Sequence, residues 1–213
     1  MAMLPRFLTA VALGALVFAP ALAASEPKSA PGGPPASGWA APPSDLPQPE
    51  RGGHGYDLDT LFAALKIAPD AESAKAIESR IWALWMASGS DTCNLLMGRA
   101  KNATDAKDYD LAIKLLDAVI EIKPDYTEAW NRRATVYYLT GDFGHSLADI
   151  RQVLIREPRH FGALSGLGLI MQDIGDDKDA LDAYRKALAI DPHLENLHDV
   201  VKTLTDKVEG RDI

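Results

Sequence analysis

Few side chains in this sequence could take part in catalysis or bind a metal ion, and their spacing does not suit either role. His193 and His198 are five residues apart, which points them to different sides of a helix. His160 and His193 each follow a proline, with no cysteine or carboxylate cluster beside them. A zinc site gathers several such ligands. We therefore expect these histidines to lie on the surface, and we expect no metal site.

Two further patterns resemble ligand-binding loops only superficially. Gly162, Gly166 and Gly168 suggest a phosphate loop, but no strand precedes them and no Gly-Lys-Ser/Thr follows. An acidic turn lacks the alternating order of a calcium loop and consists of Asp173, Asp176, Asp177 and Asp179. Closely packed helices and a solvated helix start are the better interpretations of these two patterns.

Cys93 is the single cysteine, so no intrachain disulfide can form. Its place near a helix start could lower the pKa of the thiol. Without a second thiol, a buried or inert cysteine is favoured over a redox site. No nucleophile has a plausible base nearby, and we expect neither enzymatic activity nor a cofactor.

The composition allows one compact domain and argues against two kinds of partner. The 213 residues are 47% hydrophobic and 24% charged, with a formal net charge of −8. A protein that binds nucleic acid or an anionic membrane needs a clustered basic face. The net negative charge therefore argues against nucleic acid or an anionic membrane surface as the main partner.

The chain begins like an exported protein. Residues 1–23 combine Arg6, an apolar run and the small-residue pattern Ala21-Leu22-Ala23. These features predict a signal peptide cleaved between Ala23 and Ala24, release into the periplasm and no membrane insertion afterwards. An uncleaved, membrane-anchored form is the alternative. Residues 24–55 are rich in Pro and Gly and predict a disordered linker with one aromatic residue, Trp39.

Helix-forming composition begins at Asp57, and no later window alternates as strands do. In the second expected helix, Trp82 and Trp85 belong to an apolar face that we interpret as core. The expected helices are 57–67, 71–87, 91–105, 109–122, 126–139, 143–156, 160–173, 177–190 and 195–208.

A repeat of 34 residues organises this helical part. Pro124, Pro158 and Pro192 share that spacing, which indicates a solenoid. Small residues recur where two helices must approach closely, and Gly141 and Gly175 suit the left-handed end of a first helix. Asp125 with Glu128 reads as a capping box for the next helix pair. The small positions are Ala100, Ala134 and Gly168, followed by Ala112, Ser146 and Ala180.

These spacings resemble the tetratricopeptide repeat (TPR). The middle copy carries Trp130, Ala134, Tyr137, Gly141, Ser146, Ile150, Val153 and Pro158 at the signature positions of that family. The resemblance implies an all-α, right-handed α-solenoid of helix-turn-helix repeats. The expected order is a capping helical pair at 56–90, repeats at 93–126, 127–160 and 161–194, and a capping helix with a tail at 195–213.

By that resemblance, the first helices of the repeats line a concave groove that takes an extended peptide or a partner's helix. The chain departs from the lysine/asparagine clamp of some members at Met97 and Gly162. Arg99 and Arg133 are expected to pack between helices with their heads reaching an acid or water. The expected groove residues are Asn94, Met97, Lys101, Glu128, Asn131, Thr135, Tyr138, Ser165, Leu169 and Gln172.

We therefore expect a non-enzymatic interaction scaffold of the bacterial envelope. The alternative is a self-associating structural or assembly-accessory protein, which leaves a homo-oligomer open.

Overall fold

The computed structural model of the chain describes residues 57–210, apart from the side chains of residues 195 and 196. The signal segment, the linker with Trp39 and the last three residues lie outside the described part. Within it the chain forms nine helices and no strands, each helix within one residue of its expected bounds. They are α2 (Leu58–Lys66), α3 (Ala71–Met86), α4 (Asp91–Asp105), α5 (Tyr109–Ile122), α6 (Thr127–Leu139), α7 (Phe143–Arg156), α8 (Phe161–Asp173), α9 (Asp177–Ile190) and α10 (Glu195–Val208).

The helix ends follow from local residues. Asp142 and Asp176 cap α7 and α9 through side chains that accept a backbone N–H, which satisfies a donor that the helix leaves unpaired. The first helices of the repeats end in a left-handed residue, at Gly141 (φ 78°) and Gly175 (φ 87°) as expected, and at Lys107 (φ 60°) in the first repeat.

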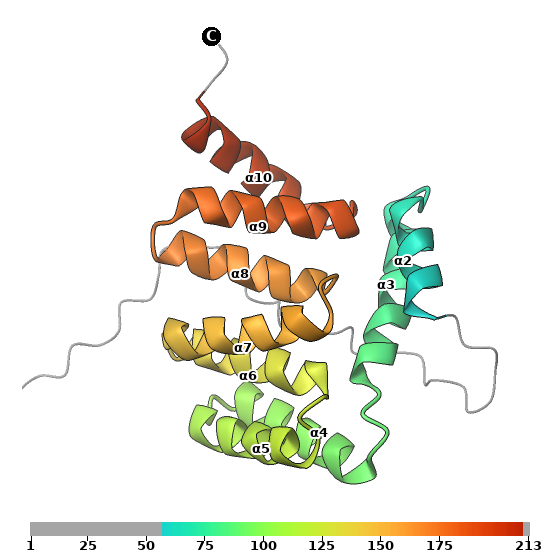
Figure 1. Cartoon of the computed structure of the whole chain (residues 1–213), viewed down its shortest axis with the longest axis vertical. Helices are drawn as coiled ribbons and strands as arrows, with labels where there is room; N and C mark the ends of the chain where they lie inside the picture. The colour runs from blue at the N-terminus through green and yellow to red at the C-terminus, as the bar shows by residue number, and fades with distance from the viewer. Residues whose placement is uncertain (1–56, 211–213) are drawn as a thin grey trace, which may run out of the picture.

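Helices α4 to α10 form a right-handed α-solenoid, stacked one on another along the long axis of the molecule (Figure 1). The three repeats are the pairs α4–α5, α6–α7 and α8–α9, and α10 packs on α9. Ala100, Ala134 and Gly168 are buried where the two helices of each pair meet. The core consists of apolar clusters within and between these pairs.

The α2–α3 hairpin does not occupy the place of an end cap. It stands beside the stack and runs along it (Figure 1), with α3 against α6 and α2 against α9. The sequence suggested a pair that closes the solenoid in front of the first repeat, and the structure corrects this position. Periodicity identifies the apolar face of α3, with Ile81, Trp82 and Trp85 buried, but it does not identify the surface that covers this face.

Candidate partner-binding surface

The turns between repeats line up along one side of the solenoid and hold the α2–α3 hairpin. We name residues 123–126, 157–160 and 191–194 the proline-turn edge. At the first turn, Tyr126 Oη donates to Met86 O at 2.9 Å. At the second, Arg159 Nη1 lies 2.6 Å from Asp59 Oδ1. At the third, His193 Nε2 lies 3.1 Å from Ala68 O. One hairpin thus contacts all three repeats.

Aromatic side chains form the centre of this contact. The rings of Trp85 and His160 stack with centroids 4.0 Å apart and planes 7° from parallel. Trp82 meets Phe161 edge-on at 5.6 Å. A Cβ on Gly162 would lie 3.0 Å from Trp82 Cη2, so the absence of a side chain there lets the indole approach α8. Such pairs contribute beyond the apolar area that they bury.

Glu128 and His160 form a buried polar pair beneath these rings, and both side chains are 0% exposed. His160 Nε2 lies 3.4 Å from Glu128 Oε2, and Arg132 Nε donates to Glu128 Oε1 at 3.2 Å. His160 Nδ1 accepts the N–H of Ala163 and so caps α8. The expectation of a surface histidine at 160 is therefore wrong. Both side chains are closed off from solvent, and their contacts join α6, α8 and the ring of Trp85 in α3.

The capping box expected from Asp125 and Glu128 is also absent. The N-cap of α6 is Tyr126, which makes no side-chain cap hydrogen bond, and Asp125 is exposed. Glu128 instead pairs with Arg132 and accepts from Asn131 Nδ2 at 3.1 Å. The sequence has the spacing of a capping box, but Glu128 is buried beside His160 and contacts other side chains instead.

The ten expected groove residues divide between buried and accessible positions. Five are closed off from solvent, so a partner cannot contact them in this conformation: Met97, Glu128, Asn131, Thr135 and Leu169. The other five are exposed or partly exposed: Asn94, Lys101, Tyr138, Ser165 and Gln172.

The accessible positions lie mostly toward the ends of the first helices and are polar. Lys101 Nζ lies 2.6 Å from Asp105 Oδ2 on the surface of α4. Tyr138 Oη donates to Asp173 Oδ2 at 2.9 Å, which links α6 to α8. Burial raises the pKa of Tyr138, and the bond to Asp173 adds to this rise, so the hydroxyl stays protonated and remains a donor. This surface can offer hydrogen bonds and single charges to a partner.

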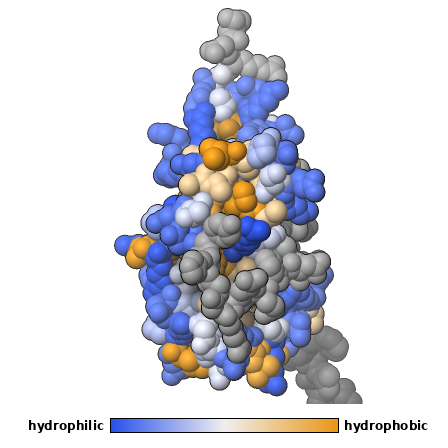
Figure 2. All heavy atoms as spheres, turned by 90° about the vertical axis from the view of Figure 1, so that its right-hand side faces the viewer, coloured by the Kyte–Doolittle hydropathy of each residue, from blue (hydrophilic) through white to orange (hydrophobic). Residues whose placement is uncertain are grey.

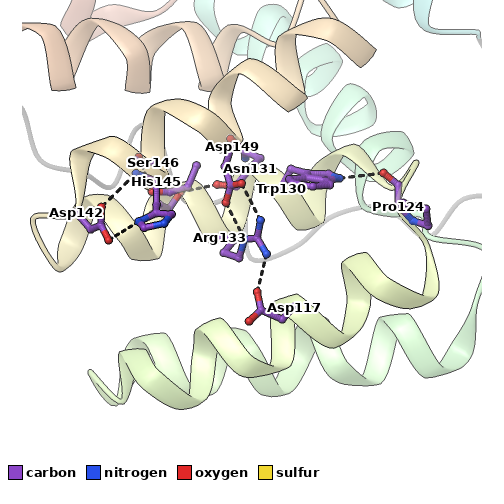
Figure 3. A network of polar contacts seen from close by, with 11 residues as sticks. Asp117, Pro124, Trp130, Asn131, Arg133, Asp142, His145, Ser146 and Asp149 are labelled. Carbon is purple, nitrogen blue, oxygen red and sulfur yellow. Dashed lines mark hydrogen bonds and ion pairs between the residues drawn. The ribbon is translucent and has the colours of Figure 1, made fainter.

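Arg133 joins the first two repeats through a network drawn in Figure 3. Its Nε and Nη2 atoms form a two-pronged contact with Asp149 of α7, and Nη1 lies 2.6 Å from Asp117 Oδ1 of α5. The guanidinium also lies 5.0 Å from the centre of the Trp130 ring. The expected packing of Arg133 between helices is confirmed, whereas Arg99, at the same position of the first repeat, is exposed.

Sequence reasoning missed the residues that hold the hairpin, Tyr126 and His160 above all. The sequence did contain a signal for these two residues, because Tyr126 follows Pro124 at the same spacing at which His160 follows Pro158. The prediction that Cys93 is buried is confirmed.

The described part of the chain contains no candidate for a metal site or for a membrane-spanning helix. Within residues 57–210, no three His, Cys, Asp or Glu side chains are grouped as metal ligands would be. In the same range, no helix combines the length and the apolar character needed to cross a membrane.

The stacked helix pairs define an α-helical repeat protein of the solenoid class. Models of the tetratricopeptide repeat match residues 97–147 and 161–194, the second range being that of the third repeat. A TPR repeat-containing protein of Rhizobium etli is 42% identical over 153 residues, which cover 72% of this chain and 75% of that protein. This chain belongs to the tetratricopeptide-repeat family.

More distant proteins are similar to this chain over about half of its length. A small glutamine-rich TPR-containing protein of Mycosarcoma maydis is 29% identical over 48% of this chain and 29% of its own length. The Sgt2 TPR domain of Aspergillus fumigatus matches with a TM-score of 0.52 at 24% identity, covering 56% of this chain and 81% of that one. The first TPR domain of Spaghetti (RPAP3), solved with an HSP90 peptide, gives 0.53 at 16% identity and covers 56% and 95%.

Proposed function

We propose that this chain is an exported, non-enzymatic adaptor that binds a segment of another protein on the accessible part of the first-helix face. The observation that carries the proposal is the position of Lys101, Tyr138 and Gln172, which lie on three successive first helices and remain at the surface. Solenoids of this class use such repeated faces as extended binding surfaces. The domain of Spaghetti bound to an HSP90 peptide supports a protein ligand for the fold.

The chemistry of this face suits a polar, extended segment better than an apolar one. Lys101 supplies donors, and Asp105, Asp173 and the phenolic oxygen of Tyr138 supply acceptors. The hairpin covers the starts of α6 and α8, so the binding face is narrower than the ten expected residues indicate. The partner thus contacts the ends of these helices.

Site-specific crosslinking tests this function. A photoreactive amino acid is placed at position 101 or 138, and a matched control is placed at Lys114, an exposed residue on the second helix α5. We expect an adduct with the same protein from positions 101 and 138 and none from 114. Equal adducts from all three positions, or none from 101 and 138, would contradict the proposed binding face.

Export to the periplasm is part of the proposal and rests on residues 1–23, with cleavage between Ala23 and Ala24. Cell fractionation of a tagged chain, with mass spectrometry of its N-terminus, provides the test. A cytoplasmic chain that retains residue 1 would exclude export, and a membrane-bound chain that retains residues 1–23 would favour the anchored form.

A further inference from the structure

Helix α4 has one side that the rest of the solenoid leaves open. In the second and third repeats, the equivalent side of the first helix packs on the preceding helix, α5 or α7. Ala129 and Ala163 on that side are 0% exposed, and Val136 and Ile170 are 1% and 0% exposed. In α4 the same two positions hold Leu95 and Asn102, and Leu95 is 58% exposed.

The opening follows from the place of the α2–α3 hairpin. A helical pair in front of the first repeat would cover this side of α4, but the hairpin stands along the proline-turn edge instead (Figure 1). Figure 2 shows two separate groups of hydrophobic side chains at the lower end of the molecule, where α4 and α5 lie. Leu95 is exposed at a position where the other two repeats pack against a helix. This side of α4 is therefore suited to contact another helix.

The charges on this side are complementary to themselves under a two-fold axis. Asp91, Leu95 and Arg99 are spaced by four residues, so they form one ridge along α4, and all three are exposed. If two copies of α4 cross antiparallel at Leu95, each residue before the leucine meets the residue equally far behind it on the other copy. Asp91 then faces Arg99 of the second copy, and this pair occurs twice because the contact is symmetric.

We propose that the chain forms a weak two-fold dimer through α4, with Leu95 at the axis and two Asp91–Arg99 pairs around it. The occupant of the open side is a second copy of this chain. A single pair of helices buries less area than a typical stable interface, so we expect a weak dimer whose population depends on concentration. The ion pairs are exposed at the rim, and salt therefore weakens the dimer.

A pair of charge-reversed variants tests the geometry in sedimentation equilibrium from about 5 to 500 µM, a range that covers weak association. Asp91→Arg places two positive charges on the ridge of each copy, and Arg99→Asp places two negative ones. We expect the parent chain to dimerise, each variant alone to remain monomeric, and an equimolar mixture of the two variants to dimerise again. Leu95→Glu serves as a third variant and is expected to remain monomeric.

Each result decides the proposal. A parent chain that stays monomeric over the whole range overturns it and leaves the open side to a different protein. A mixture that associates no better than its components also overturns it, as does a dimer that persists unchanged in all three variants. The substituted residues are exposed, and circular dichroism before each run shows that the variants keep the helical content of the parent.

Discussion

At the scale of single residues, one repeat position serves different purposes in successive repeats. Position 99 carries an exposed arginine, and position 133 carries an arginine held between two carboxylates. Asp149, the more buried of the two partners, is 5% exposed and receives two hydrogen bonds from the guanidinium. A planar guanidinium matches a carboxylate in this two-pronged way, and a lysine does not.

Arg133→Ala should lower the free energy of unfolding by about 2–4 kcal/mol, because it leaves the Asp149 carboxylate buried without its main partner. Arg99→Ala is the matched control from the same repeat position and should change it by less than about 0.5 kcal/mol. Urea unfolding of both variants, followed by circular dichroism, measures the difference. Equal effects would contradict a role for burial.

Asp191 lies on the third turn of the proline-turn edge and is 0% exposed. Burial raises its pKa above the ordinary value of 3.8, while the N–H of His193 and the neighbouring Glu78 offset part of the rise. The folded chain therefore binds this proton more tightly than the unfolded chain does. The contribution of Asp191 to the unfolding free energy is most favourable at low pH and falls as the pH rises through about 4 and up to the folded pKa.

Asp191→Asn should thus raise the unfolding free energy at neutral pH, and the gain should disappear below about pH 4, where the parent carboxyl is protonated in both states. Asp142→Ala is a control of opposite sign, since the N–H of His145 lowers the pKa of that exposed capping carboxylate. Urea unfolding at several pH values from about 3 to 8 measures both variants. A pH-independent gain for Asp191→Asn would contradict the assignment.

At the scale of the helical pair, the distance between helices is set by matched side-chain sizes. A Cβ on Gly168 would lie 2.5 Å from Tyr184 Cε1, closer than atoms can approach, and the tyrosine is 1% exposed. In the first repeat, the positions that correspond to Gly168 and Tyr184 hold Ala100 and Leu116, and both are buried. A glycine is therefore needed only where its partner is an aromatic ring.

Gly168→Ala should lower the unfolding free energy by about 1–3 kcal/mol through this clash. Gly168→Ala combined with Tyr184→Leu copies the pair of the first repeat and should recover more than half of the loss. Gly98→Ala, in an open part of a helix with nothing within 4 Å, should instead raise stability by up to about 1 kcal/mol. Thermal and urea unfolding of the three variants test the account, which fails if the double variant is less stable than Gly168→Ala.

At the scale of the whole molecule, the α2–α3 hairpin changes how the repeats depend on one another. In a simple solenoid each repeat contacts only its neighbours, and the ends open independently. Here one hairpin contacts the turns of all three repeats. Local opening of one repeat therefore removes contacts that the others also use.

Trp85→Ala should lower the unfolding free energy by about 3–5 kcal/mol, the cost of removing a large buried aromatic side chain. Hydrogen exchange should accelerate in α2 and α3 most and also in the three proline-containing turns, because the stack with His160 is lost. Exchange followed by mass spectrometry of peptides measures this pattern. Faster exchange confined to α3 alone would show that the hairpin does not couple the repeats.

Local signals and long-range contacts differ in how far the sequence predicts them. The helix bounds were predictable because periodicity, Gly141, Gly175 and the three prolines all act within a few residues. The burial of Glu128 and Asn131 was not, since it depends on packing around His160 and on a hairpin placed by contacts between distant segments. The spacing of residues shows which of them share a face, but not what lies against that face.

The contacts of the hairpin also determine when the molecule can be completed. Arg159 and Asp59 are 100 residues apart in sequence, and His193 and Ala68 are 125 apart. A ribosome makes the hairpin before the three repeats, and the turn that holds its far end emerges only after all of them. Each repeat can fold from local contacts as it appears, but Trp82 and Trp85 must wait for Phe161 before they are covered. The newly made chain therefore passes through an interval in which Trp82 and Trp85 are not yet covered by Phe161.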